Sequence, residues 1–488
     1  MAVTRYQALA DDIAHSIRVG LLRAGDKLPS VRETCASRGV SPSTVFQAYY
    51  LLEARGLVQA RPRSGYYVRA LPRHRPPEPD TSQPRDGSTS LAISDRIFDI
   101  LDSVHDRKVV PLGSAFPAAS LFPLERLGQA MAGYLRHLDP HDTVESLSPG
   151  HPRLRRQIAL RYRAAGVPVA PDDVVVTTGA LEALNLCLHV TTRPGDAVIV
   201  ESPTFYGALQ ALEQRGLRAV EVPTHPRRGI DLDALETAIA RHAPKACWLM
   251  TQFQNPLGSL MSEPDKRALV ALLARHQIPL IEDDVYGELY FGDARPRPAK
   301  AYDTQGLVLH CSSFSKCLAP GYRIGWAVAG RYARTVQRLK LATTLSASGP
   351  AQGALAQYLE RGGYDRHLRR LRGTLAAQQE RMLDAVARYF PAGTRVTRPT
   401  GGFFVWLEMP EQADALDLHR RALAHGISVA PGPIFSASGQ FGHALRLNYG
   451  HPWDDRMENA VRELGSLAGR RRGAAPAAGP ARRARLAP

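Results

Sequence analysis

The proline-rich stretch of residues 70–90 places the strongest constraint on how this chain can fold. It reads ALPRHRPPEPDTSQPRDGSTS and holds five prolines among serine, threonine, glycine and aspartate. Proline lacks a backbone N–H and clashes with the preceding helical turn, so neither a helix nor a sheet ladder can run through this stretch. Its composition is typical of a semi-extended linker. We therefore predict a first domain at residues 1–69, a linker over 70–105 and a second domain over 106–465.

Positive charge is concentrated at the two ends of the chain. The 488 residues carry a net charge of +16, of which residues 1–75 supply +7 and residues 466–488 supply +6. A basic module favours binding to nucleic acid or to another anionic surface. Codon bias is the alternative explanation for the positive charge of the tail, because only seven of the 62 basic residues are lysines. The Ala/Pro/Arg-rich composition of 466–488 predicts disorder.

Several classes of protein are disfavoured by what the sequence lacks. It has no run of about 18 apolar residues, which argues against a membrane span. Its first residues, MAVTRYQALADDIAHSI, have no apolar signal core, so we do not expect secretion. The five cysteines are scattered without a CxxC pair, which favours a reducing, cytoplasmic setting and argues against a structural zinc site. We expect no bound metal.

The pattern of the first domain predicts three helices followed by two short strands. Apolar residues recur at helical spacing over 5–19, which indicates an amphipathic helix. Ser30 and Ser41 each stand where an N-cap begins a further helix, and Glu33 completes a capping box with Ser30. A helix, a short glycine-containing turn and a second helix form the pattern of a helix-turn-helix. Two short β runs follow, at 57–60 and 66–69, and predict a wing.

Three segments of this domain resemble the winged helix of GntR-type bacterial regulators: GDKLPSVRE, GVSPSTVFQAYYLLEARGLV and RPRSGYYV. The resemblance implies contact with double-stranded DNA through the second helix, the start of the third helix and the wing. Hydroxyls and a helix N-terminus suit phosphate oxygens, and arginine suits phosphate or guanine. The alternative to DNA contact is simple helix capping for the serines and a place on a solvated helix face for Arg32. The implied DNA-binding residues are Arg32, Ser41, Ser43, Thr44, Arg63, Ser64 and Gly65.

The second domain alternates short apolar β runs with longer amphipathic segments. This alternation predicts an α/β fold with a mainly parallel sheet. Such sheets bind ligands at the carboxyl ends of their strands. The predicted strands include 174–177, 197–200, 249–251, 279–281 and 308–310.

Polar motifs follow these strands, at the edge where a ligand is expected. A glycine-containing turn at 178–184 opens a helix whose free N–H groups can bind phosphate. Residues 201–207 bring an aromatic pair, which either stacks on a planar ring or packs in the core. Three acids leave the strand within 281–287, and they suit either a metal or the nitrogen of a ring. Lys316, among serines and followed by Arg323, can act as an amine nucleophile beside an anion site.

Taken in order over about residues 112–450, these motifs resemble the fold-type I pyridoxal-phosphate enzymes, the aspartate aminotransferase superfamily. The resemblance implies a large domain with a smaller C-terminal α/β subdomain. It implies that Lys316 forms the internal Schiff base with pyridoxal 5'-phosphate. It also implies that Asp283 keeps the pyridine nitrogen protonated, which lets the ring act as an electron sink. The three-residue spacing to Tyr286 favours Asp283 over Asp284 for this role.

The remaining site residues are implied by the same resemblance. Tyr286 and Asn255 match the partners of the cofactor's phenolic oxygen, and Phe205 matches the residue stacked on its ring, with Tyr206 as the alternative. Arg446 matches the arginine that pairs bidentately with a substrate α-carboxylate. The implied catalytic residues are Lys316, Asp283 and Tyr286, and the implied phosphate site consists of Gly179, Ala180, Ser313, Ser315 and Arg323.

A GntR-type winged helix joined by a linker to an aminotransferase-like domain resembles the MocR-type regulators. This resemblance implies a cytoplasmic, homodimeric transcription regulator that binds operator DNA and takes pyridoxal phosphate or an amino acid as cofactor or effector. A ligand that binds one dimer conformation better would shift the DNA-binding modules. The second hypothesis is a working amino-acid aminotransferase with an accessory winged helix. A metal-dependent enzyme is the weakest hypothesis, because the acids at 282–284 have no obvious histidine partner.

Overall fold

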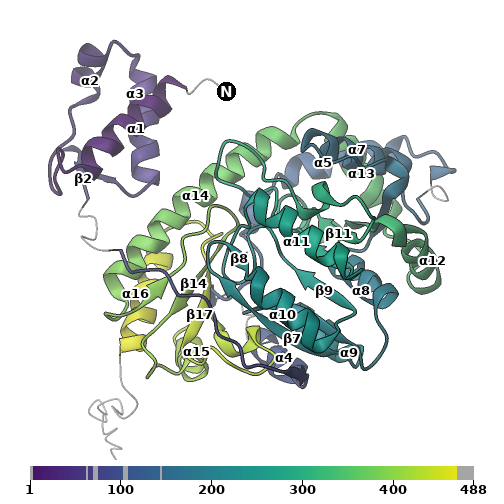
Figure 1. Cartoon of the computed structure of the whole chain (residues 1–488). Helices are drawn as coiled ribbons and strands as arrows, with labels where there is room; N and C mark the ends of the chain where they lie inside the picture. The colour runs from purple at the N-terminus through teal and green to yellow at the C-terminus, as the bar shows by residue number, and fades with distance from the viewer. Residues whose placement is uncertain (1–3, 62–63, 70–74, 103–107, 143–145, 470–488) are drawn as a thin grey trace, which may run out of the picture.

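A small helical domain precedes a large domain built on a central sheet (Figure 1). The computed structural model describes residues 4–61, 64–69, 75–102, 108–142 and 146–469. Of the predicted site residues, Arg63 lies outside these ranges. No helix within them is long and apolar enough to cross a membrane.

The small domain has the three helices and the two-stranded wing that its sequence pattern predicts. Ser30 and Ser41 cap their helices, because each side-chain oxygen accepts a hydrogen bond from the backbone N–H three residues on. Gly39 ends the second helix at a φ of +60°, a left-handed conformation that glycine adopts without steric cost. The elements are α1 (Arg5–Arg18), α2 (Val31–Arg38), α3 (Pro42–Ala54), β1 (Val58–Arg61) and β2 (Gly65–Val68), the two strands being antiparallel.

Residues 75–102 lie along the large domain, and we call this segment the strap. Arg75 at its start forms an ion pair with Glu380, with 2.6 Å between nitrogen and oxygen. Further along, Ser82 Oγ donates a hydrogen bond to the carbonyl oxygen of Ser202 over 2.5 Å. The stretch predicted as a linker is therefore held against the large domain over these residues.

The later part of the strap adds secondary structure to the large domain. Strand β3 (Ser88–Ser90) pairs antiparallel with β7 (Arg218–His225) and extends the central sheet by one strand. Helix α4 (Ser94–Asp102) follows, and the Glu213 carboxylate accepts hydrogen bonds from the backbone N–H groups of Ile93 and Ser94. A carboxylate at a helix N-terminus is favourable because it meets the positive end of the helix dipole.

The central sheet has nine strands in the order β3-β7-β6-β9-β10-β11-β12-β5, with β8 paired to β7. Strands β7, β6, β9, β10 and β11 run parallel, whereas β12 is antiparallel to both of its neighbours. The strands not yet bounded are β5 (Val174–Thr177), β6 (Ala197–Ser202), β8 (Gly229–Ile230), β9 (Ala246–Leu249), β10 (Leu280–Asp283), β11 (Val308–Ser313) and β12 (Gly325–Val328).

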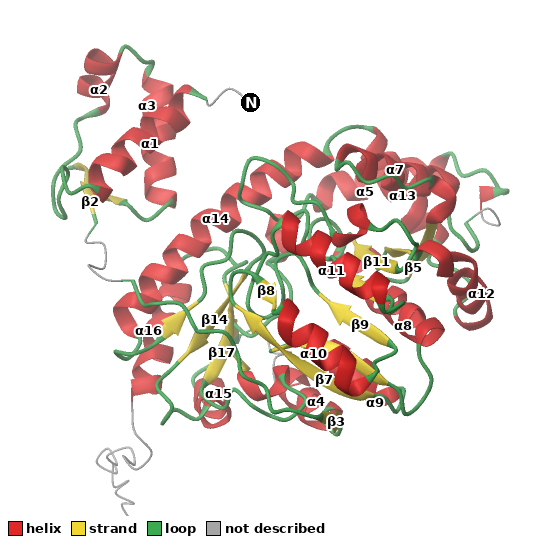
Figure 2. Cartoon of the chain, viewed as in Figure 1, coloured by secondary structure: helices red, strands yellow, loops and turns green. Residues whose placement is uncertain are grey.

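Both faces of this sheet are buried, which explains why its strands are nearly continuous apolar runs. Along β6, Val198 and Val200 belong to one hydrophobic cluster, whereas Ala197 and Ile199 belong to the other. Helices α10 and α11 cover the second cluster, and Figure 2 shows them lying over the strands. The predicted α/β class with a mainly parallel sheet is confirmed. The helices here are α5 (Leu124–Arg136), α7 (Pro152–Ala164), α8 (Ala180–Thr191), α9 (Tyr206–Gln214), α10 (Leu232–His242), α11 (Glu263–Arg275), α12 (Ala333–Thr343) and α13 (Gly349–Glu360).

A second, four-stranded sheet in the order β13-β14-β17-β16 forms a smaller C-terminal subdomain. Its central pair, β14 and β17, is antiparallel and places Arg446 opposite Trp406. A separate parallel pair, β4 (Val110–Pro111) with β15 (Ile427–Ser428), ties the start of the large domain to this subdomain. The elements are β13 (Arg395–Val396), β14 (Phe404–Glu408), β16 (Ala430–Pro431), β17 (Ala444–Asn448), α14 (Tyr364–Tyr389), α15 (Ala415–Ala424) and α16 (Asp455–Gly469).

Candidate functional site

A cavity of about 270 Å³ opens at the carboxyl ends of the parallel strands. This is the edge at which α/β sheets bind ligands, because loops and helix N-termini converge there. Gly179 and Arg446 lie just behind its wall and contact residues that line it. The predicted site residues that line it are Ala180, Phe205, Asn255, Asp283, Tyr286, Ser313, Ser315, Lys316 and Arg323.

Lys316 presents its amine to this cavity. Its Nζ donates a hydrogen bond to the carbonyl oxygen of Ala115 over 2.9 Å and lies 3.6 Å from the centroid of the Phe116 ring. Burial lowers the pKa of Lys316 to about 7, and the positive charge of Arg446 acts in the same direction while Asp283 opposes it. A lysine with this pKa is partly neutral at neutral pH, which is the form that attacks a carbonyl carbon.

The three consecutive acids at the end of β10 point to three different places. Glu282 is buried and accepts hydrogen bonds from Thr251 Oγ1 and from the backbone N–H of Ala299, each over 2.6 Å. Asp284 is buried on another side, with its Oδ2 3.1 Å from His310 Nε2. Only Asp283 of the three lines the cavity. Strand alternation turns Asp283 away from the side of Glu282, and Asp284 takes a third direction because it follows the last residue of β10.

Asp283 carries an unused hydrogen-bond acceptor inside the protein. The residue is 1% exposed, and its Oδ1 has no hydrogen-bond partner within the described part of the chain. Burial, and after it the neighbouring carboxylate of Asp284, raises the pKa of Asp283 to about 7. An orphaned buried carboxylate oxygen is costly, so its position at a cavity wall indicates a ligand that supplies an N–H or O–H group.

A candidate anion site lies where α8 begins. Gly179 precedes the helix at a φ of +82°, and a Cβ placed on it would lie 2.5 Å from Arg323 Nη2. Only glycine therefore lets the Arg323 guanidinium approach the free backbone N–H groups of this helix. Arg323 Nη1 also donates to Ser315 Oγ over 3.1 Å. A helix N-terminus, a guanidinium and a serine hydroxyl together suit a phosphate group.

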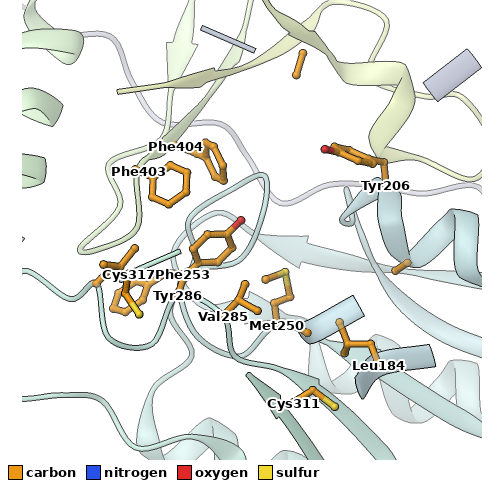
Figure 3. Packing of buried hydrophobic residues seen from close by; sticks show 14 of the residues in the cluster. Leu184, Tyr206, Met250, Phe253, Val285, Tyr286, Cys311, Cys317, Phe403 and Phe404 are labelled. Carbon is orange, nitrogen blue, oxygen red and sulfur yellow. The ribbon is translucent and has the colours of Figure 1, made fainter. Parts of the chain in front are cut away.

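Aromatic rings form the sides of the cavity. Phe205 and Tyr206 both line it, with ring centroids 4.9 Å apart. Tyr286 lies opposite and packs edge-on against Phe403 and Phe404, as Figure 3 shows. Burial raises the pKa of the Tyr286 hydroxyl. The predicted stacking residue and its alternative are thus neighbours in one wall.

Arg446 is a buried cation without a carboxylate partner among the residues that the structure describes. Its side chain is 0% exposed and lies over the Phe404 ring, with Cζ 4.1 Å from the centroid. Its Nη1 donates to Asn255 Oδ1 over 3.0 Å and its Nη2 donates to the carbonyl oxygen of Gly113 over 2.7 Å. Neutral oxygens compensate a guanidinium poorly, so this position suits an anionic ligand group.

The segment 113–116 contributes to the site and was missed by the sequence reasoning. It brings the carbonyl oxygens that bind Lys316 and Arg446, and the Phe116 ring beneath the lysine amine. Its residues, Gly-Ser-Ala-Phe, carry no chemical motif. They reach the cavity because β4 pairs with β15, which no local pattern reveals.

The predicted DNA-contacting residues within the described ranges are exposed, except for Thr44 and Ser64, which are half-buried. Arg32, Ser41 and Ser43 are exposed, and Ser41 Oγ lies 2.9 Å from Ser43 Oγ while also capping α3. In the wing, Ser64 Oγ bonds the Tyr67 hydroxyl over 2.7 Å. Gly65 follows at a φ of +106°, a conformation that side chains rarely adopt.

Two family models match the chain in agreement with this geometry. The model of bacterial regulatory proteins of the gntR family matches residues 5–68, and that of aminotransferase class I and II matches residues 107–464. The uncharacterized HTH-type transcriptional regulator YdcR of Escherichia coli is 49% identical over 463 residues, covering 95% of this chain and 98% of that protein. The 2-aminoadipate transaminase of Thermus thermophilus is 34% identical over 370 residues, covering 73% and 89% respectively.

Solved structures resemble the large domain. The multiple substrate aminotransferase of Thermococcus profundus superposes with a TM-score of 0.72 at 27% identity, covering 78% of this chain and 95% of that one. The α-aminoadipate aminotransferase LysN of Thermus thermophilus, complexed with N-(5'-phosphopyridoxyl)-L-leucine, superposes with a TM-score of 0.68 at 32% identity, covering 78% and 98%. The chain therefore belongs to the GntR-family helix-turn-helix transcriptional regulators in which the DNA-binding domain is fused to an aminotransferase class I and II domain.

Proposed function

We propose that this regulator, of the MocR kind, holds pyridoxal phosphate in its aminotransferase-like domain and changes its binding to operator DNA when an amino acid enters the same cavity. The observation that carries the proposal is the unused acceptor of Asp283 in a cavity that also presents the Lys316 amine and the anion site. Each of these groups has a counterpart on the cofactor. We further propose a cytoplasmic homodimer.

The residues present fit pyridoxal phosphate. Asp283 would accept a hydrogen bond from the protonated pyridine nitrogen, and the start of α8 with Arg323 would hold the phosphate. Phe205 would stack on the ring, and Lys316 would anchor the aldehyde carbon. When bound, the cofactor supplies an electron sink for bonds at the α-carbon of an amino acid.

Arg446 is the proposed receptor for the amino acid's carboxylate. A carboxylate that replaces Asn255 as its partner would pair with the guanidinium in a dry, low-dielectric setting, where such pairs are strong. The exchange would also release Asn255 Oδ1 from Arg446, while the amide NH₂ group of Asn255 is the part that can donate to the cofactor's phenolic oxygen. Binding of the amino acid would therefore change the contacts of both residues at once.

The strap offers a physical route from this cavity to the DNA-binding domain. Phe205 and Tyr206 follow β6 by a few residues, and the last residue of β6, Ser202, accepts the hydrogen bond from Ser82 of the strap. Toward the N-terminus, the strap leads directly to the winged helix. A ligand that favours one position of the 203–206 turn would bias the strap and through it the affinity for DNA. By linkage, DNA would then change the affinity for the ligand by the same factor.

A working aminotransferase is the second candidate function. The specific observation that favours it is that the amine, the carboxylate and the carboxylate-binding arginine are all present. Accessory DNA binding would then have no part in the reaction. We favour regulation because an aminotransferase has no use for a DNA-binding domain of its own.

A gel shift tests the proposed function directly. The full-length protein is mixed with DNA from upstream of its own gene, with and without pyridoxal phosphate and with a panel of amino acids. We expect a specific complex whose affinity changes when cofactor and one class of amino acid are both present. A DNA affinity that stays the same with every ligand would contradict the proposed regulation.

Arg32→Ala should weaken DNA binding by roughly 1–3 kcal/mol if Arg32 bonds a base through both of its terminal nitrogens. Because the side chain is exposed, its removal should leave the fold intact. Arg5→Ala, which removes an equal charge from the exposed start of α1, serves as the matched control. Titrations against specific and scrambled duplexes distinguish base contact from phosphate contact, since loss of a phosphate contact weakens both equally. Unchanged binding by Arg32→Ala would contradict the assignment.

A further inference from the structure

Helix α3 carries large apolar side chains on the side that faces away from the domain core. Phe46 is 44% exposed and Tyr50 is 59% exposed. Their rings stack, with centroids 6.4 Å apart and planes inclined by 25°. Ser43 and Gln47 are also exposed. They lie on the same face of α3, because residues three and four apart share one face of a helix. We call Ser43, Phe46, Gln47 and Tyr50 the exposed stripe.

The exposed stripe runs from the start of α3 to the wing. Ser43 begins it, beside the capping residue Ser41. At the other end, the Tyr49 ring packs edge-on against Tyr66 of β2 with centroids 5.1 Å apart. Glu53 accepts a hydrogen bond from the backbone N–H of Ala60 on β1. These contacts place this end of α3 next to the wing. Phe46 therefore lies between the two groups of residues that are proposed to contact the DNA backbone.

The charge of the small domain indicates which kind of molecule binds the exposed stripe. Ion pairs hold the two acids of α1, Asp12 with Arg38 at 2.7 Å and Asp11 with Arg55 at 2.5 Å. Glu33 is engaged in capping α2. The domain keeps an excess of positive charge, which attracts a polyanion and repels a second copy of itself.

We propose that Phe46 contacts the C5-methyl group of a thymine in the major groove and so sets a preference for thymine at one position of each half-site. This inference rests on the proposed DNA-binding function. In the major groove, the base edges present hydrogen-bonding groups and one apolar group, the thymine methyl. A phenyl ring forms no hydrogen bond, so the methyl is the base feature that it can recognise. Tyr50 stacks against the ring and restricts its orientation.

Replacing thymine with deoxyuridine tests this contact, because it removes the methyl group and leaves every hydrogen-bonding group in place. The full-length protein first selects duplexes from a random-sequence pool. Each thymine of the selected duplex is then replaced singly by deoxyuridine. We expect one position in each half-site at which wild-type affinity falls about fourfold, the factor for returning one methyl group to water.

Variants of the protein assign the effect to Phe46. Phe46→Ala should bind the thymine and deoxyuridine duplexes equally at that position, whereas Phe46→Leu should keep part of the difference. Leu21→Ala removes an apolar side chain that is 76% exposed in the same domain but outside the exposed stripe, so it should discriminate as the wild type does.

Two outcomes separate this inference from the function on which it rests. Selection of a specific sequence whose binding no deoxyuridine affects would overturn the thymine contact and leave the DNA-binding function standing. Failure of the full-length protein to select any sequence would overturn both. If Phe46→Ala instead alters only self-association on DNA, the exposed stripe is a protein contact and the inference is wrong.

Discussion

Lys316→Ala is expected to abolish the visible absorption band that the wild-type protein gains with pyridoxal phosphate. The band depends on a covalent bond that only the neutral form of the lysine amine can form with the cofactor. Burial and Arg446 lower the pKa of Lys316 to about 7, so the neutral fraction is large near neutral pH. Since a protonated amine cannot attack, the rate of attachment should rise as pH increases through about 7. Absorption spectra recorded over a pH series that spans neutrality measure both effects.

Lys245→Ala is the matched control, because Lys245 is exposed at the start of β9 and far from the strand ends that bind ligands. It should keep the full band. Circular dichroism shows whether Lys316→Ala retains its fold. Borohydride reduction followed by peptide mapping locates the cofactor, and an adduct that persists in Lys316→Ala would assign it to another of the seven lysines.

Arg446→Ala should abolish the spectral response of the cofactor-loaded protein to amino acids. Removing one partner of a buried, hydrogen-bonded charge pair costs about 2–5 kcal/mol, which corresponds to a loss of affinity from tens-fold to thousands-fold. The cofactor band itself should remain, because Arg446 contacts Asn255 and Gly113 rather than the lysine or the anion site, but its pH dependence should shift upward because Arg446 lowers the pKa of Lys316. Titration with amino acids, followed by absorption, gives the affinity.

Arg446→Lys separates charge from geometry. A lysine keeps the positive charge but cannot bond a carboxylate through two parallel N–H groups, so it should restore part of the affinity. An Arg446→Ala protein that keeps both its band and a wild-type response to amino acids would place the carboxylate elsewhere. Loss of the band as well would indicate a damaged cavity. The response of Arg446→Lys to amino acids would then show whether a positive charge at this position binds them.

The same titrations distinguish regulation from catalysis when keto acid is assayed alongside. An aminotransferase releases keto acid over many turnovers once an acceptor is supplied. A regulator changes its spectrum and its DNA affinity without sustained release. We expect the second pattern, and many turnovers combined with DNA affinity that ignores the amino acid would favour the enzyme.

Local patterns predicted much of the architecture because short-range chemistry determines it. Ser30 and Ser41 cap helices where their sequence contexts indicate, since capping depends on residues three positions away. The strand expected at 249–251 instead spans Ala246–Leu249. Its apolar run continues past the point where pairing with β10 stops, and periodicity cannot show where a neighbour ends.

Long-range contacts account for what the sequence did not reveal. Strand β12 runs antiparallel to both β11 and β5, and its pairing with β5 joins residues about 150 positions apart in the sequence. The segment 113–116 is held at the cavity by the pairing of β4 with β15 and by hydrogen bonds from the distant residues Arg446 and Asn448. The proline-rich composition correctly excluded helix from the start of the strap. The exclusion of a sheet ladder from all of 70–90 was wrong, because Ser88–Ser90 lie beyond the last proline of this stretch and pair with β7.

The pairing of the strap with β7 also determines where this chain can be cut. A fragment that begins at residue 106, the start of the predicted second domain, loses β3 and uncovers the backbone N–H and C=O groups of Arg218, Ala219 and Val220. An open edge of this kind recruits strands from other molecules and promotes aggregation. A fragment that begins at residue 75 keeps the edge covered, so the smallest well-behaved form of the ligand-binding unit includes the strap.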